Sequence, residues 1–185
     1  MTVIAANVTL APAPGARVLG VGTAAELAHA CEQEFGACDV LLMAAAVADF
    51  RPSRPAAAKL KKDQGTPTIE LDPTTDVRSS VAQRRSSGQI LVGFAAEHGA
   101  GAIEYGRGKL ERKGLDVVVV NDISRPEIGF DVSDNEVTIL TADGARREVS
   151  RTSKQQVARA ALDEVERLRA SSTEGTGGSS PSTRR

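Results

Sequence analysis

The stretch Asp39-Val-Leu-Leu-Met-Ala-Ala-Ala46 decides the fold class, because it is an unbroken apolar run. Two similar runs follow it, Gln89-Ile-Leu-Val-Gly-Phe-Ala-Ala96 and Asp116-Val-Val-Val-Val-Asn121. Runs of this kind are typical of strands that are covered on both faces in a parallel sheet. The sequence therefore predicts three buried parallel strands.

Helical patterns alternate with these strands. Thr23, followed three residues later by Glu26, forms a capping box at the start of the first helix. We expect helices over residues 23–35, 76–85, 102–113 and 153–170. This alternation predicts an α/β fold, a doubly wound, Rossmann-like sheet whose strands end along one ligand-binding crevice.

The remaining segments complete one expected domain over residues 1–170, followed by a disordered tail over 171–185 that is rich in Ser, Gly and Thr. We expect strands over residues 2–10 and 17–21. Two hairpins are predicted, one over residues 59–71 and a second over residues 136–149. In the first hairpin, extended residues would place Lys59 and Lys61 on one side, with Leu60 facing inward.

Composition excludes several function classes. The formal net charge is −1, aromatic residues make up 3% and there is no Trp, which argues against nucleic-acid binding. No apolar run reaches the roughly 18 residues of a membrane span. Cys31 and Cys38 fit neither a disulfide framework nor a zinc spacing, so we expect reduced thiols and a cytoplasmic protein.

Two segments lie where an open α/β sheet binds ligands, at the ends of predicted strands. Residues 44–49 combine small side chains, which let a ligand approach the backbone, with the carboxylate of Asp49. Asn121 and Asp122 follow the third strand. Tight helix packing and an ordinary turn are the alternative explanations.

Four lysines are candidates for binding phosphate. Lys59 and Lys61 would present two ammonium groups on one face, and Lys109 and Lys113 are spaced i and i+4 on a predicted helix. Charged side chains that only face solvent are the alternative in both places.

Residues 20–25, Gly-Val-Gly-Thr-Ala-Ala, fit the dinucleotide pattern G-x-G-x-x-A, and Asp39 lies about 20 residues further on. However, the preceding strand is very short, Asp39 begins a strand instead of ending one, and the capping box explains Thr23 and Glu26 without a ligand. An NAD(P)-binding Rossmann oxidoreductase module is the alternative function.

Six segments in order resemble one known family. They are Ala5-Ala-Asn-Val-Thr-Leu10, Ala44-Ala-Ala-Val-Ala-Asp-Phe-Arg-Pro52, Lys59-Leu-Lys-Lys62, Gly93-Phe-Ala-Ala-Glu97, Lys109-Leu-Glu-Arg-Lys113, and Asn121-Asp122 with Gly129-Phe130 and Asp134-Asn135. The sequence resembles the phosphopantothenate–cysteine ligase domain of the bifunctional coenzyme A biosynthesis flavoprotein.

The resemblance implies that CTP and Mg²⁺ activate 4′-phosphopantothenate as an acyl-cytidylate, which the cysteine amine then attacks. It makes Lys59 the catalytic residue of the activation step, and Asp49 the residue that helps to hold the metal. It implies nucleotide contacts from Met43, Ala44, Ala45, Ala46, Asp49, Lys59, Asp76, Phe94, Lys109 and Lys113, and substrate contacts from Ala45, Ala46 and Asn121. FMN would belong only to a fused decarboxylase half, which is absent here.

Two departures from the family qualify these expectations. Thr74-Thr-Asp-Val77 stands where the family has Asn-Pro-Asp-Ile, so only Asp76 is retained. The Gly-Gly-Thr phosphate loop, its strand and the Asn-x-Ser-Ser-Gly segment are not in the chain. We therefore expect an N-terminally truncated ligase domain, inactive or weak by itself, that forms a homodimer through the region of residues 129–144.

Overall fold

The computed structural model describes residues 1–8, 13–99, 101–124 and 134–174, and within these ranges not the side chains of residues 64 and 172–174. The chain divides into two compact units. Unit 1 comprises residues 1–35 and 45–81, and unit 2 comprises residues 36–44 and 82–185. The expectation of one domain over residues 1–170 stays a prediction.

Unit 2 is built on a five-stranded mixed sheet in the order β3-β6-β7-β8-β9. Its strands are β3 (Val40–Met43), β6 (Ile90–Glu97), β7 (Val117–Asp122), β8 (Asp134–Thr141) and β9 (Arg146–Ser153). The strands β3, β6 and β7 are parallel neighbours, as the three apolar runs predicted. β8 and β9 pair antiparallel and extend the same sheet. The predicted α/β fold class is confirmed.

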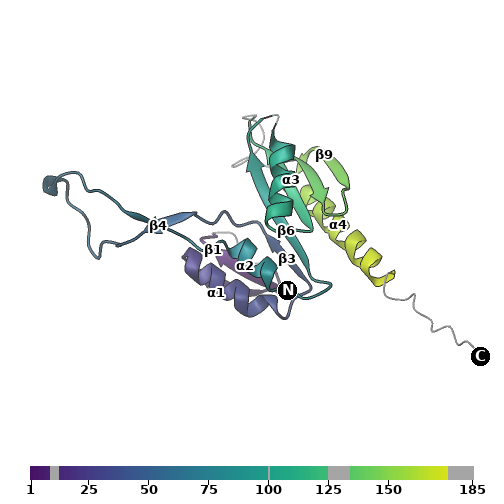
Figure 1. Cartoon of the computed structure of the whole chain (residues 1–185), viewed down its shortest axis with the longest axis horizontal. Helices are drawn as coiled ribbons and strands as arrows, with labels where there is room; N and C mark the ends of the chain where they lie inside the picture. The colour runs from purple at the N-terminus through teal and green to yellow at the C-terminus, as the bar shows by residue number, and fades with distance from the viewer. Residues whose placement is uncertain (9–12, 100, 125–133, 175–185) are drawn as a thin grey trace, which may run out of the picture. The chain divides into compact units, whose positions relative to one another are not determined.

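Helices cover both faces of this sheet (Figure 1). α4 (Lys154–Glu174) packs on the face that carries Val117, Val119 and Ile139, which form one buried cluster with Val157 of the helix. α3 (Ala102–Arg112) packs on the opposite face, where the position of a Cβ on Gly106 would lie 2.4 Å from Val120 Cγ2. The unbroken apolar runs are thus explained, because neighbouring residues of β7 face two different helices.

Unit 1 contains a short parallel pair, β1 (Thr2–Ala6) and β2 (Arg17–Val21), followed by α1 (Ala24–Phe35). The predicted capping box is present at the start of α1. Thr23 Oγ1 accepts from Glu26 N at 3.2 Å, and Glu26 Oε2 accepts from Thr23 N at 3.0 Å. Each side chain therefore satisfies a backbone donor that the helix leaves unpaired.

A two-stranded arm also belongs to unit 1. β4 (Phe50–Pro52) pairs antiparallel with β5 (Leu71–Pro73), and the 3₁₀ helix η1 (Lys62–Gln64) lies in the long connection between them. The hairpin predicted within residues 59–71 is wrong, because pairing occurs only nearer the base of the arm. Leu60 is 55% exposed instead of facing inward, since the arm has no apolar layer against which to pack.

The helix boundaries differ from prediction by a few residues. α2 (Val77–Gln83) is shorter than expected, and α4 continues to Glu174, beyond the predicted end at Ala170. The predicted disordered tail from residue 171 therefore overlaps the helix, and residues 175–185 lie outside the described residues. None of the described helices is long and apolar enough to span a membrane.

Candidate functional site

The pairing of β3 with β6 brings two predicted nucleotide-binding residues, Met43 and Phe94, close together in unit 2. Met43, the last residue of β3, pairs with Gly93. Phe94 is therefore the first residue of β6 beyond the end of β3, beside the point at which the chain continues into Ala44. The place where β3 ends and β6 continues lies toward the carboxyl edge of the sheet, where α/β folds bind ligands.

Asn121 lies further along the same edge, near the end of β7, where it pairs with Ala96 of β6. Its Nδ2 donates to Asn135 Oδ1 on β8 at 3.2 Å. Asn121 Oδ1 is buried and accepts no hydrogen bond from the described residues. Asn121 was expected to follow the third strand, whereas β7 continues through Asp122 and includes it, and its contact with substrate stays a prediction. Its pairing with Asn135 was not predicted, since nothing in the sequence links two asparagines across a hairpin.

Lys109, in α3, and Lys113, the residue that follows α3, lie at the other end of unit 2. Lys113 N donates to Lys109 O at 3.0 Å in the last turn of the helix, and the chain then reaches Asp116, whose N–H donates to Leu91 O at 3.0 Å. This bond lies at the amino ends of β6 and β7. Within unit 2 the structure does not bring Lys109 and Lys113 next to Asn121, and their contact with nucleotide remains a prediction.

The other predicted site residues belong to unit 1, where Asp49 forms a hydrogen bond with the connection between β5 and α2. Thr74 N donates to Asp49 O at 2.8 Å, and Thr74 Oγ1 donates to Ala48 O. Ala45 and Ala46 lie just before this contact in the chain. Unit 1 therefore places the segment with Asp49 next to the segment that leads to Asp76.

Asp76 has a structural role that the sequence indicated only in outline. Its Oδ1 accepts from Ser79 N at 3.2 Å and its Oδ2 accepts from Ser79 Oγ at 2.8 Å, which caps the start of α2. A carboxylate at this end of a helix is also favoured by the helix dipole. Asp76 therefore stabilises α2 whether or not it contacts a ligand.

Lys59 lies on the arm, in the connection between β4 and β5, and is exposed. The base of the arm is held by Ser53 Oγ, which donates to Asp72 Oδ1 at 2.8 Å, and by Ser53 N, which donates to Glu70 O at 3.0 Å. Figure 1 shows the arm extending from the helices of unit 1, with η1 at its far end. The predicted pairing of Lys59 and Lys61 on one strand face is not present, because residues 59–61 form no strand.

The glycine-rich turn before α1 is occupied by its own carboxylate. Glu26 Oε2 accepts from Gly22 N at 2.7 Å and from Thr23 N at 3.0 Å. These hydrogen bonds, with that from Gly22 the larger cause, lower the pKa of Glu26. A dinucleotide phosphate would need the same N–H groups, so the turn favours the capping explanation over phosphate binding.

Titratable clusters do not indicate any other chemistry. In the described part of the chain, no three His, Cys, Asp or Glu side chains lie close enough together to hold a metal ion by themselves. Cys31 is buried in α1 and Cys38 is half-buried, and neither forms a disulfide. The predicted reduced thiols are thus consistent with the structure.

Fold and site together define an α/β protein: unit 2 has an open sheet with candidate ligand-binding residues along the carboxyl edge of its parallel strands, and unit 1 carries further candidates on its two-stranded arm. The chain belongs to the family described as the DNA/pantothenate metabolism flavoprotein C-terminal domain, which matches residues 1–168. The resemblance stated from the motifs is therefore confirmed at the level of the family.

Individual relatives agree with this assignment. The coenzyme A biosynthesis bifunctional protein CoaBC of Mycobacterium bovis is 40% identical over 160 residues, which cover 82% of this chain and 38% of that protein. A crystal structure of the C-terminal domain of CoaBC has a TM-score of 0.74 at 28% identity and covers 90% of this chain and 73% of that chain. A Cab2 mutant in complex with phosphopantothenate-cysteine has a TM-score of 0.65 at 14% identity and covers 87% of this chain and 55% of that chain, a likeness of fold alone. The chain thus spans well under half the length of its curated bifunctional relative.

Proposed function

We propose that this chain is the domain of a coenzyme A biosynthesis enzyme that joins cysteine to 4′-phosphopantothenate at the expense of CTP. The observation that carries the proposal is the family match over residues 1–168, since that range contains every residue assigned to the site. The arrangement of Met43, Phe94 and Asn121 along one edge of the sheet supports it.

The proposed reaction has two steps. A carboxylate oxygen of phosphopantothenate attacks the α-phosphorus of CTP, and pyrophosphate leaves as the acyl-cytidylate forms. The cysteine amine then attacks the acyl carbon, which releases CMP and a proton and leaves an amide. Negative charge develops on the phosphate oxygens in the first step, and we assign its stabilisation to the ammonium group of Lys59.

Magnesium fits the side chains of the site only as an ion that arrives with the triphosphate. Mg²⁺ commonly binds through one or two carboxylates, the phosphates of the substrate and several waters, so it does not require a cage of protein ligands. Asp49 is the carboxylate that we assign to it. The absence of a three-ligand cluster among the described residues is consistent with this mode of binding.

Assembly and location complete the proposal. We propose a homodimer formed through residues 129–144, of which residues 129–133 lie outside the described residues and residues 134–144 form β8 and the turn after it. We also propose a cytoplasmic location, which the expected reduced state of Cys31 and Cys38 supports.

CTP binding is the decisive measurement. Residues 1–185 contain no Asn-x-Ser-Ser-Gly segment, to which the family resemblance assigns the second step, so we expect weak or no ligation by the chain alone. Calorimetric titration with CTP and Mg²⁺ should give saturable binding. Lys59→Ala should weaken that binding by roughly ten- to a hundredfold, because one charge-assisted contact to phosphate contributes roughly 1.5–3 kcal/mol.

Lys62→Ala is the matched control, because Lys62 lies on the same arm and is also exposed. Its affinity for CTP should equal that of the unmodified chain, and both variants should keep the circular dichroism spectrum of the folded protein. Where ligation is measurable, Lys59→Ala should abolish it. Saturable NAD(P) binding without CTP binding would instead support the dinucleotide alternative and refute the proposal.

A further inference from the structure

Thr74 connects two segments of unit 1 that lie far apart in the sequence. Its backbone N–H donates to the carbonyl oxygen of Asp49 at 2.8 Å, and its Oγ1 hydroxyl donates to the carbonyl oxygen of Ala48. Two consecutive carbonyl groups are therefore held by one residue. The hydroxyl adds a constraint that a backbone hydrogen bond alone does not supply, because it fixes the orientation of the peptide unit before Asp49.

Both sides of this contact lead directly to residues of the proposed site. Asp49 is one of them, and Asp76 lies two residues beyond Thr74, where it caps α2 through Ser79. The first residue of β4 and the last residue of β5 lie beside this contact, since Phe50 pairs with Pro73. Thr74 therefore closes the base of the arm that carries Lys59.

We propose that the Thr74 hydroxyl is a positioning group for nucleotide binding, which holds the Asp49 segment and the base of the arm in the geometry that receives the triphosphate. Thr74 itself does not contact the reacting atoms. The inference rests on the proposed function, since it assumes that Asp49 and Lys59 bind CTP. It also applies to this chain in particular, because the family resemblance has asparagine at this position.

The hydroxyl can be removed with little change in side-chain volume. Thr74→Val keeps the β-branched shape and the backbone N–H but leaves the Ala48 carbonyl without the hydroxyl donor. We expect the dissociation constant for CTP to rise roughly 3- to 10-fold, which corresponds to the loss of one ordinary hydrogen bond. Thr74→Ser restores a hydroxyl at the same position and should restore most of the affinity.

Two control variants separate positioning from general destabilisation. Thr75→Val makes the same chemical change at the neighbouring residue, which is exposed and forms no hydrogen bond with the described residues. Thr23→Ala removes the cap of α1, in the same unit, and should lower the melting temperature. Neither control should change the dissociation constant for CTP.

The outcomes distinguish this inference from the proposed function. If the unmodified chain does not bind CTP, the proposed function fails. If it binds CTP and Thr74→Val binds equally well, only the role of Thr74 is refuted. If Thr23→Ala weakens CTP binding as much as Thr74→Val does, the effect of Thr74 is one of stability and the positioning role is likewise refuted.

Discussion

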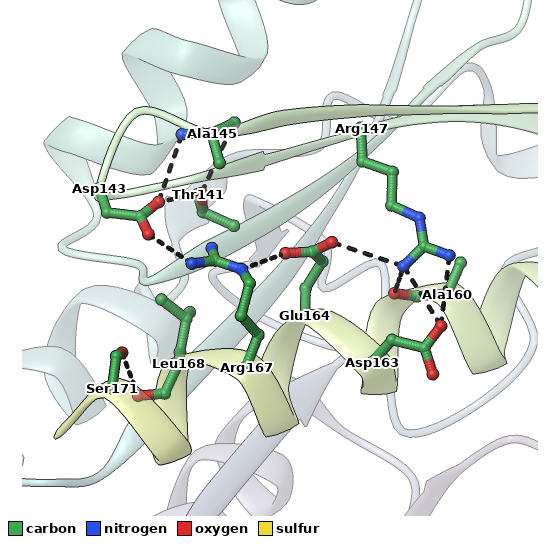
Figure 2. Close-up of polar contacts among 10 residues, drawn as sticks. All are labelled: Thr141, Asp143, Ala145, Arg147, Ala160, Asp163, Glu164, Arg167, Leu168 and Ser171. Atoms are coloured by element: carbon green, nitrogen blue, oxygen red, sulfur yellow. Dashed lines mark hydrogen bonds and ion pairs between the residues drawn. The ribbon is translucent and has the colours of Figure 1, made fainter. Parts of the chain in front are cut away.

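Arg167 of α4 donates a hydrogen bond of 2.7 Å to Asp143, which lies in the turn between β8 and β9 (Figure 2). The same guanidinium donates through Nε to Glu164 at 2.8 Å. Arg147 of β9 contacts the same helix through its Nη1, which donates to Glu164 at 3.4 Å and to Asp163 at 3.2 Å. Alternating charges thus connect the last helix of unit 2 to its edge hairpin.

Removing the central arginine should weaken unit 2 measurably. In Arg167→Met, Asp143 and Glu164 lose their shared partner while the aliphatic part of the side chain is largely kept. We expect the free energy of unfolding in urea to fall by about 1 kcal/mol, at the upper end for partly exposed ion pairs, because one guanidinium serves two carboxylates.

Arg159→Met provides the comparison on the same helix, since Arg159 is exposed and has no ion pair within the described residues. Its unfolding free energy should stay within about 0.5 kcal/mol of the unmodified value. Equal losses in the two variants would mean that the ion pairs of Arg167 do not stabilise the hairpin.

Asp143 should make the stability of unit 2 dependent on pH in the acidic range. Two hydrogen bonds hold the pKa of Asp143 well below its ordinary value. The bond from Arg167 is the main cause, and the bond from Thr141 is the second. A depressed folded-state pKa means that the unfolded state binds more protons near pH 4. The stabilisation is therefore complete above the ordinary pKa of about 3.9 and is lost as the pH falls.

The variant Asp143→Asn should flatten the dependence of unfolding free energy on pH between about pH 5 and pH 2. The same substitution introduced into Arg167→Met should have a smaller effect, since the main cause of the shift is then gone. An unchanged slope in the single variant would contradict the assignment of this pH dependence to Asp143.

Two glycines of α3 should respond in opposite directions to the same substitution. A Cβ on Gly106 would lie 2.4 Å from Val120 Cγ2, in the buried contact between α3 and β7. A Cβ on Gly108 would lie 2.7 Å from Arg112 Nη1, the end of a flexible side chain. We expect Gly106→Ala to lower the melting temperature, at a cost of about 1–3 kcal/mol, because Val120 is packed and cannot move away.

Gly108→Ala should raise the melting temperature, since alanine is favoured over glycine within helices by about 1 kcal/mol. Differential scanning calorimetry would compare the melting temperatures of the two variants with that of the unmodified chain. Stabilisation by both substitutions would mean that α3 does not pack against β7 as closely as the structure describes.

Much of the fold could be predicted from local patterns. The three apolar runs predicted the three parallel strands, because burial between two helical layers demands apolar residues at every position. Thr23 and Glu26 predicted the start of α1, since a capping box satisfies helix donors three residues away. The arm was not predicted correctly, because its strands are three residues long and its connection is exposed, so it carries no periodic signal.

The candidate site was predictable only in part. The rule that ligands bind at the carboxyl ends of parallel strands drew attention to residues 44–49 and to Asn121, whereas Met43 and Phe94 were named only through the family resemblance. The motif with Lys109 and Lys113 gave no indication that these lysines lie at the far end of unit 2. Helix direction decides this, since α3 begins beside the end of β6 and its last turn comes next to the start of β7.

The sequence by itself determined the family, the parallel strands and the cap of α1, because these depend on residue types within a few positions of each other. Only the tertiary structure decided that Thr74 holds Asp49 and that Asn121 pairs with Asn135. Such contacts join residues that the chain brings together through strand register and loop path. A local sequence pattern contains no information about strand register or loop path. The Thr74 hydroxyl therefore became a candidate positioning group only once its hydrogen-bond partners were known.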